Sequence, residues 1–342
     1  MALIERYCTS AGAGAHDGTS EANAWSWIEA DASAGVGQRI NLKGDFGLSS
    51  AYTWSLDCGF TSAVVYRGYA TTPGDGGYAN FFHPASTMTF AGSGTTYESI
   101  AVSAAVQYGA VATLSDNNIK LIKCRFENTR GLADGLLLDV AGGADGGQVL
   151  GCYFKGLGFD GSDQVYTSGG LSIIGCTVNA SKGRLVNFFA NFRHHKCVGN
   201  LLVGASGTDS VGIYAQNSSS ASELMITGNT IVNVTTGILT TGSKAEPTDS
   251  TMIMNNLIYG TTSGIDLQLA SSDLAIRPAL INNAIGATAN PYVNVHEHLT
   301  ISPVTLTADP FTDKANNDYS LNDVAGGGAL CKGLGIGPPD IT

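Results

Sequence analysis

Short apolar segments interrupted by a glycine or an asparagine recur along this chain. In "MIMNNLIYG" (252–260) apolar residues lie on both sides of Asn255 and Asn256, which neither an amphipathic helix nor a single alternating strand produces. Similar segments align when one reference residue is taken from each: Cys124, Cys152, Cys176, Asn200, Asn229, Asn256 and Asn283. The successive spacings are 28, 24, 24, 29, 27 and 27 residues, so the pattern is an internal repeat.

The residues around each reference position are constant in character. Two positions later the residue is always apolar: Phe126, Phe154, Val178, Leu202, Ile231, Ile258 and Ile285. Three positions earlier it is also apolar: Leu121, Val149, Ile173, Cys197, Ile226, Ile253 and Leu280. The residue just before the reference is Lys123 in the first repeat and glycine or asparagine in the others. Glycine and asparagine tolerate the left-handed backbone of a sharp corner, so each repeat reads as strand, corner and strand.

A repeat of 24 to 29 residues built this way has the length of one coil of a parallel β-helix. Leucine-rich repeats have a similar period, but their LxxLxLxxN consensus is missing. A third strand is predicted in many coils, at 135–140, 183–189, 211–216, 236–241 and 263–269. The chain is therefore predicted to be all-β, with three parallel sheets.

The reference residues are predicted to form an internal ladder. Adjacent parallel strands lie about 4.8 Å apart, so an inward asparagine can hydrogen-bond to its equivalent in the next coil. Asn200, Asn229, Asn256 and Asn283 are expected to stack in this way, and Cys124, Cys152 and Cys176 to continue the column as stacked thiols. This role is structural, so we expect these residues to be neither catalytic nor metal-binding.

Composition narrows the classes of partner. The 342 residues include 45 glycines, only 13% are charged, and the formal net charge is −11. This charge disfavours nucleic acid as a partner. We find no apolar run of membrane-spanning length and no Sec-type signal, so no membrane partner and no self-export are expected. The seven scattered cysteines are expected to be free thiols in a protein made in a reducing cytoplasm.

Both ends of the chain resemble one family. The opening "YCTSAGAGAHDGTSEANAWSW", the later "GVGQRINLKGDF" and the closing "DPFTDKANNDYSLNDVAGGGALCKGLGIG" are similar to the ends of pectate-lyase-like right-handed parallel β-helix proteins. The resemblance implies a single right-handed domain. Residues 1–50 would form an N-terminal cap with a short helix near "NAWSWIEADAS", 51–300 the coils, and 301–342 a C-terminal cap.

This fold serves polysaccharide lyases and hydrolases, adhesins and phage structural proteins. The NTD, DD, GHG and RIK-like motifs of the hydrolases are absent. A lyase would need carboxylates for Ca²⁺ and a Lys or Arg base in one groove. Spacing allows Asp134, Asp160 and Arg184 to stack on one face. Asp163, Lys182, His194 and His195 would lie close by, although all of these could equally be solvated residues of loops or exposed strands.

The opening and the "YRGYATTPGDGG" turn look like phage-associated β-helix proteins. The main functional expectation is therefore a non-enzymatic virion surface protein without a cofactor, either a capsid decoration or a head or tail fibre-like element. It would be made in the host cytoplasm and form a homotrimer. Its expected partners are other virion proteins such as the capsid, together with cell-surface polysaccharide. The alternative is an extracellular lyase or glycoside hydrolase acting on acidic polysaccharide.

Overall fold

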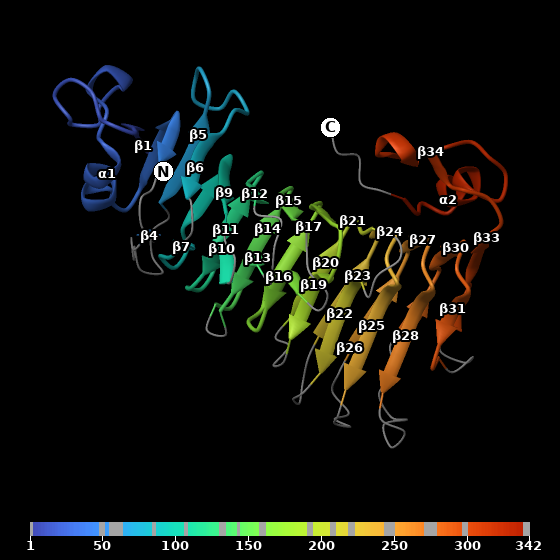
Figure 1. The fold of residues 1–342 in the computed structure, drawn as a ribbon. Coiled ribbons are helices and arrows are strands. Elements are labelled where there is room, and N and C mark those ends of the chain that lie inside the picture. Colours follow the sequence, from blue (N-terminus) through green and yellow to red (C-terminus); the bar gives the residue numbers. More distant parts are fainter. Residues whose placement is uncertain are drawn as a thin grey trace. The chain divides into compact units, whose positions relative to one another are not determined.

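The computed structural model describes residues 3–47, 52–54, 64–83, 87–105, 109–129, 135–141, 144–156, 162–189, 194–205, 210–217, 223–242, 250–269, 279–295 and 300–337. The chain divides into two compact units, Met1–Leu157 (unit 1) and Gly158–Thr342 (unit 2). In each unit successive strands are laid side by side in three parallel sheets, as Figure 1 shows. The prediction of an all-β, right-handed parallel β-helix is confirmed.

Unit 1 contains the first strands of every sheet. Its sheet 1 has the order β1 (Ile4–Thr9), β2 (Gln38–Lys43), β5 (Val65–Tyr69), β8 (Thr96–Glu98), β11 (Lys120–Ile122) and β14 (Gly147–Leu150). Its sheet 2 has the order β3 (Asp45–Gly47), β6 (Ala79–His83), β9 (Ile100–Ala104), β12 (Arg125–Asn128) and β15 (Tyr153–Gly156). Its sheet 3 has the order β4 (Tyr52–Trp54), β7 (Met88–Phe90), β10 (Gly109–Leu114) and β13 (Gly135–Val140).

Unit 2 repeats this arrangement. Its sheet 1 has the order β17 (Leu171–Ile174), β20 (His195–Val198), β23 (Glu223–Thr227), β26 (Ser250–Met254), β29 (Ala279–Ile281) and β32 (Thr300–Ile301). Its sheet 2 has the order β18 (Thr177–Ala180), β21 (Leu201–Val203), β24 (Thr230–Val232), β27 (Leu257–Tyr259), β30 (Ala284–Gly286) and β33 (Val304–Leu306). Its sheet 3 has the order β16 (Asp163–Thr167), β19 (Arg184–Phe189), β22 (Val211–Asn217), β25 (Thr236–Gly242), β28 (Ser263–Leu269) and β31 (Asn290–Val293).

A left-handed residue makes the corner between sheet 1 and sheet 2 in seven successive coils. The backbone φ angle is 51° at Lys123, 58° at Gly151, 62° at Gly175, 61° at Gly199, 64° at Gly228, 55° at Asn255 and 52° at Asn282. Most side chains make this conformation costly, which explains why glycine and asparagine recur there. The residue that follows the corner then points into the coil.

The asparagines after these corners form a hydrogen-bonded ladder inside unit 2. The Nδ2 of Asn200, Asn229 and Asn256 donates to the Oδ1 of the asparagine in the next coil, at 2.9 Å in each step. The same Oδ1 atoms also accept the preceding backbone N–H groups, at 3.0–3.1 Å. All four asparagines, Asn283 included, are at most 1% exposed. The ladder therefore satisfies polar groups that burial would otherwise leave unpaired.

Cysteines and aromatic rings fill the corresponding positions of unit 1. The backbone N–H of Cys124 donates to the Sγ of Cys152, at 3.3 Å. The rings of Phe126 and Phe154 are stacked directly behind this corner, with their centroids 5.2 Å apart. Among the described cysteines none forms a disulfide, and all are buried. The cysteine part of the column thus depends on apolar packing more than on strong hydrogen bonds.

Short helices and an antiparallel hairpin lie at the chain ends. Near the start are η1 (Glu21–Asn23) and α1 (Trp27–Ser33), and parallel pairing is already present in β1 and β2. In unit 2, parallel pairing extends to β33, which lies beyond residue 300. The hairpin of β34 (Phe311–Asp313) and β35 (Asp318–Leu321) and the helices η3 (Lys314–Asn316) and α2 (Gly328–Gly333) follow. None of the helices in the described residues has the length and apolarity needed to cross a bilayer.

The apolar side of the C-terminal segment closes the core of unit 2. Phe311, Tyr319, Cys331 and Ile336 are buried against the last inward residues of sheet 2, which include Leu306. The rings of Phe311 and Tyr319 meet edge to face, with centroids 5.4 Å apart. This packing removes the exposed end of the apolar column from water, which a stack of coils requires.

Replacing Asn256 with alanine should destabilise the protein by at least about 2 kcal/mol, because buried N–H and C=O groups lose their partners. These groups are the Asn229 amides and the carbonyl of Ile226. Asn290→Ala, which changes an exposed side chain on β31, is the matched control and should have almost no effect. Urea unfolding followed by circular dichroism measures both variants, and equal midpoints would contradict a stabilising ladder.

Helix α1 should contribute a pH-dependent part of the stability. Its Glu29 accepts hydrogen bonds from His16 and from the Ser26 N–H, which lower its pKa from 4.5 to about 2. A lowered carboxyl pKa stabilises the folded state above pH 4.5, and this contribution is lost as the pH falls towards 2. Glu29→Gln should therefore be less stable than the natural protein at pH 7, and the difference should vanish near pH 2. A difference that persists at pH 2 would overturn this assignment.

Candidate functional site

The residues expected to form a site do not all lie together. Asp134 and Asp160 are outside the described residues. Arg184 begins β19 in sheet 3 of unit 2, whereas His195 begins β20 in sheet 1 and His194 directly precedes it. Lys182 is in the corner just before Arg184. The arginine and the histidines therefore belong to two separate regions of unit 2.

Arg184 forms an ion pair with a neighbour in the preceding coil. Its Nε lies 2.7 Å from the Oδ1 of Asp163, and the two residues are register partners on β19 and β16. The Nδ2 of Asn187 donates to the other oxygen of this carboxylate, at 2.9 Å. The guanidinium of Arg184 also lies over the ring of Tyr214 in the next coil, 4.8 Å from its centroid. Three successive coils are thus joined on one side of sheet 3.

Burial and hydrogen bonding have opposite effects on Asp163. Removal from water raises the pKa of this carboxyl, because the charged form loses hydration. The hydrogen bond from Asn187 and the positive charge of Arg184 lower the pKa again, but they do not cancel the effect of burial. The side chain of Asp163 is 13% exposed and that of Arg184 is 29% exposed. Arg184 therefore holds the charge of Asp163 in place and is not a free cation.

The outer surface of sheet 3 carries two parallel rows of side chains across the coils of unit 2. In β19 the inner positions are Val186 and Phe188, so alternation places Asn187 and Phe189 on the outside. Register then gives the first row, which consists of Tyr166, Asn187, Tyr214, Leu239 and Asp266. The second row consists of Phe189, Gln216, Thr241 and Gln268. We call these nine residues the sheet 3 face; their strands β16, β19, β22, β25 and β28 can be followed in Figure 1.

Hydrogen bonds and ring contacts connect the members of the sheet 3 face. The hydroxyl of Tyr214 lies 3.1 Å from the Thr241 hydroxyl and donates to Gln216 at 3.4 Å. The rings of Tyr166 and Phe189 are 5.8 Å apart and tilted by 33°. Neither the aromatic rings nor the amides are fully buried here, apart from Asn187. The face thus offers partly exposed rings beside donors and acceptors that are held in fixed positions.

Asp266 brings a carboxylate to the last part of this face, where 9% of the residue is exposed. The Nδ2 of Asn294 donates to its Oδ1 at 2.7 Å, and the Nε2 of Gln268 donates to its Oδ2 at 3.0 Å. Each oxygen therefore already has one amide partner. In the described residues, no lysine, arginine or histidine forms an ion pair with this aspartate.

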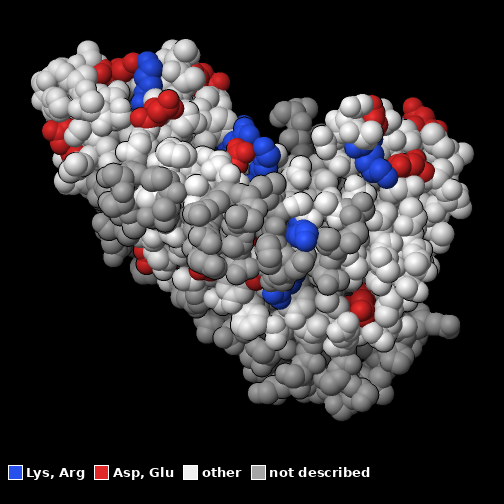
Figure 2. All heavy atoms as spheres, in the orientation of Figure 1, with Lys and Arg blue, Asp and Glu red and all other residues white. Residues whose placement is uncertain are grey.

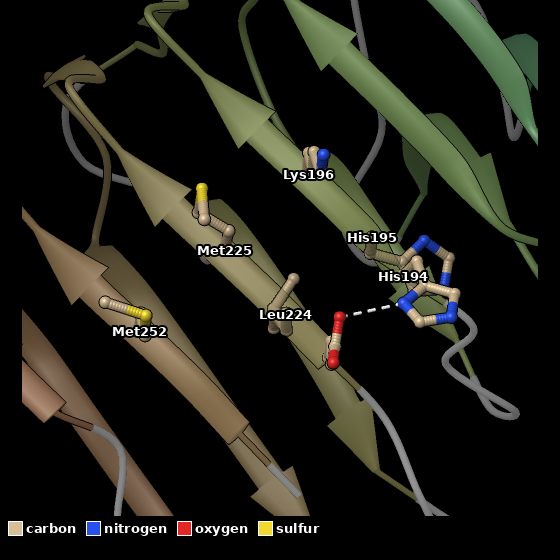
Figure 3. Close-up of a pocket in the computed structure, with 7 residues that line it drawn as sticks. His194, His195, Lys196, Leu224, Met225 and Met252 are labelled. Carbon is tan, nitrogen blue, oxygen red and sulfur yellow. Dashed lines mark hydrogen bonds and ion pairs between the residues drawn. The ribbon is translucent and has the colours of Figure 1, made fainter.

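A hollow of about 250 Å³ on sheet 1 of unit 2 is bordered by His194, Glu223 and Met252, among others. The exposed His194 has a left-handed backbone and its Nδ1 lies 2.8 Å from the Oε2 of Glu223. Figure 3 shows this contact, with Lys196, Met225 and Met252 on three adjacent strands. Both members of the ion pair are well exposed, at 75% and 65%, so solvent weakens their attraction.

His195 faces the interior and is not part of an open site. It is 1% exposed, its ring lies 4.9 Å from that of Phe188, and its Nδ1 accepts the Leu171 N–H at 3.3 Å. An imidazole in this position packs in the core of the coil. Adjacent residues of a strand point to opposite sides, so the "HHK" sequence cannot place both histidine rings in one cluster.

Sequence reasoning missed most of the sheet 3 face. Asn187, Gln216, Thr241, Asp266 and Gln268 carry no motif of their own. Two steps would have found them. The first assigns every second residue of each predicted third strand to the outside, and the second aligns these outer residues from coil to coil. No group of three or more His, Cys, Asp or Glu that could hold a metal is found among the described residues.

Comparison with known proteins gives structural likeness without a sequence match. No protein-family model matches the chain, and no curated protein matches it. A solved pectate lyase, Pel9A, is similar with a TM-score of 0.55 and 14% identity, over 90% of this chain and 77% of the other. A mannuronic acid specific family 6 polysaccharide lyase from human gut microbiota has a TM-score of 0.41 and 13% identity, over 83% and 88%. The family 6 lyase Pedsa3628 from Pseudopedobacter saltans has a TM-score of 0.36 and 11% identity, over 84% and 92%.

The likeness to the pectate lyase identifies the fold. The chain has the parallel β-helix fold, which this pectate lyase shares, and an identity of 14% says nothing about its activity. The two family 6 lyases have TM-scores too low to support an argument. The similarity to phage-associated proteins that the sequence suggests has no counterpart among these structures.

Replacing Arg184 tests the ion pair of the sheet 3 region. Arg184→Gln should lower the stability at pH 7 by about 1–3 kcal/mol, because it leaves Asp163 charged and poorly hydrated. Burial raises the pKa of Asp163 above 3.8 and removal of Arg184 raises it further, so the loss of stability should begin to shrink as the pH falls to that raised value and be small once Asp163 is protonated. In an Asp163→Asn background the loss should be small at every pH.

The control for this pair is Lys332→Gln. Lys332 is 46% exposed and its partner Asp323 is 92% exposed, so this change should cost almost nothing. Urea unfolding of the single and double variants gives the coupling between Arg184 and Asp163. A coupling near zero would show that the two charges do not depend on each other.

Proposed function

We propose that this protein binds polysaccharide along the sheet 3 face of unit 2. The observation that carries the proposal is the combination of partly exposed rings with fixed hydroxyl and amide groups on adjacent strands. Sugars bind through just these contacts: apolar C–H faces pack on aromatic rings, while hydroxyls exchange hydrogen bonds with side chains. A surface meant only to be solvated does not need either feature.

The spacing of the coils supports an extended ligand. Neighbouring strands of a parallel sheet lie about 4.8 Å apart, which is close to the length of one sugar ring along an extended polysaccharide. A chain lying across β19, β22, β25 and β28 would therefore meet a new pair of side chains at each successive sugar. The fold is shared with a pectate lyase, which makes a polysaccharide a natural ligand class for this scaffold.

The proposal is for binding rather than cleavage. Among the described strands of this region, Arg184 is the one basic side chain at a strand start, and it is engaged with Asp163 and Tyr214. These two contacts hold its guanidinium, so the side chain is not placed to take a proton from a sugar. The lyase or hydrolase anticipated as an alternative from the sequence remains testable by the same experiments.

A virion surface role stays a prediction from the sequence. Polysaccharide binding is compatible with it, because cell-surface polysaccharide is a ligand that such a protein would meet. The homotrimer that belongs to this prediction can be checked by light scattering on the purified chain, where a monomer at high concentration would contradict it.

Tyr214→Ala should weaken polysaccharide binding about tenfold, because the variant loses a ring contact and a hydroxyl that bonds to two neighbours. Phe82→Ala is the control, since Phe82 is a 50% exposed aromatic residue on sheet 2 of unit 1. Binding is measured by affinity electrophoresis in gels that contain one polysaccharide each.

The same samples are assayed for cleavage. Suppose that the natural protein releases reducing ends or unsaturated sugars while Arg184→Gln does not. That result would replace the binding proposal by an enzymatic one. If no polysaccharide retards the protein, or if Tyr214→Ala and Phe82→Ala behave alike, the sheet 3 face is not a glycan-binding surface.

A further inference from the structure

The charges of the sheet 3 face indicate what kind of polysaccharide it binds. This inference rests on the proposed function and concerns the same surface. On the described strands β16 to β28 of this surface, the charged side chains are Asp163, Arg184 and Asp266. Asp163 and Arg184 neutralise each other at a distance of 2.7 Å, so the negative charge of Asp266 is left over.

The coils beyond Arg184 present mainly uncharged groups. Their outer side chains are Tyr214, Gln216, Leu239, Thr241, Asp266 and Gln268. Amides and hydroxyls match sugar hydroxyls, since each can donate and accept. A polyanion needs lysine or arginine, which this part of the surface lacks in the described residues.

The described residues visible in Figure 2 do not supply the missing positive charge. The chain has a formal net charge of −11, which repels a polyanion at long range. On the face drawn in Figure 2, the described lysines and arginines form small separate groups rather than a continuous band. A ligand with a carboxylate on every sugar would gain little from these groups.

We infer that the sheet 3 face binds a neutral polysaccharide, with Asp266 acting against ligands that carry carboxylates. The Asp266 oxygens are each held by an amide, so the carboxylate keeps its position as the ligand approaches. Asp266 is only 9% exposed, so it acts on a ligand through its charge, and a uronate carboxylate lying on the face above it is repelled. The same residue thus disfavours acidic ligands and leaves neutral ones unaffected. This inference departs from the acidic polysaccharide that the sequence suggests for the alternative function.

The test compares ligands that differ in charge and share a backbone. Polygalacturonate and its carboxyl-reduced, neutral form make one such pair; galactomannan, xylan and a β-glucan extend the neutral set, and alginate the acidic set. Affinity electrophoresis with the natural protein should show retardation by at least one neutral polysaccharide. The retardation should be unchanged between low and physiological salt, because no ion pair is formed.

Asp266→Asn provides the decisive variant. It should raise the ratio of acidic to neutral affinity by up to about fivefold, because two like charges about 4 Å apart in water repel by about 1 kcal/mol and Asp266 lies just beneath the face. The matched control is Asp323→Asn, a change at a 92% exposed carboxylate that lies outside this face, and it should leave the ratio unchanged. Circular dichroism of both variants verifies that they are folded.

Two kinds of failure can be told apart. Salt-sensitive binding to acidic polysaccharides alone, with Tyr214→Ala still defective, would overturn the neutral ligand and leave the glycan-binding proposal intact. If Asp266→Asn and Asp323→Asn have the same effect on the ratio of acidic to neutral affinity, the role of Asp266 is overturned. Failure of every neutral and acidic polysaccharide to bind would overturn both proposals.

Discussion

The left-handed corner between sheet 1 and sheet 2 is the constraint on which the rest of the structure depends. It turns the chain within one residue, so the next side chain must point inward, where only a small or self-complementary group can be stacked repeatedly. Asparagine meets this demand by bonding both to its equivalents and to backbone groups. Once the corners are fixed in register, alternation determines which residues of the following strands are buried and which are exposed.

The exposed surface follows from this register. Tyr214 and Asp266 lie in one row because β22, β25 and β28 are held in step, although the residues are 52 positions apart in the sequence. The interior needs apolar residues at every second position and leaves the outer positions free to vary. A binding surface can therefore change without altering the core, which is why this fold alone does not define a ligand.

The sequence predicts the fold much better than the surface. Corner and ladder positions repeat the same residue type in each coil, so the positions of Asn229 and Asn256 can be read directly. Outer positions such as Gln216 and Thr241 differ from coil to coil, and their proximity becomes visible only when the third strands are paired. Spacing alone grouped Arg184 with His194 and His195, but the chain passes from sheet 3 to sheet 1 between them. Asp134 and Asp160, which completed that group, lie outside the described residues.

The asparagine ladder also makes the coils modular. Asn229, Asn256 and Asn283 are separated by 27 residues in both steps, and the bonds of one step repeat those of the other almost unchanged. Every amide donates in the same direction along the stack, so an added coil of equal length would find a donor on one side and an acceptor on the other. The ladder itself sets no limit on the number of coils. The stack of coils is closed instead where Phe311 and its neighbours cover its core, and a longer stack could arise by duplication of a single coil within the gene.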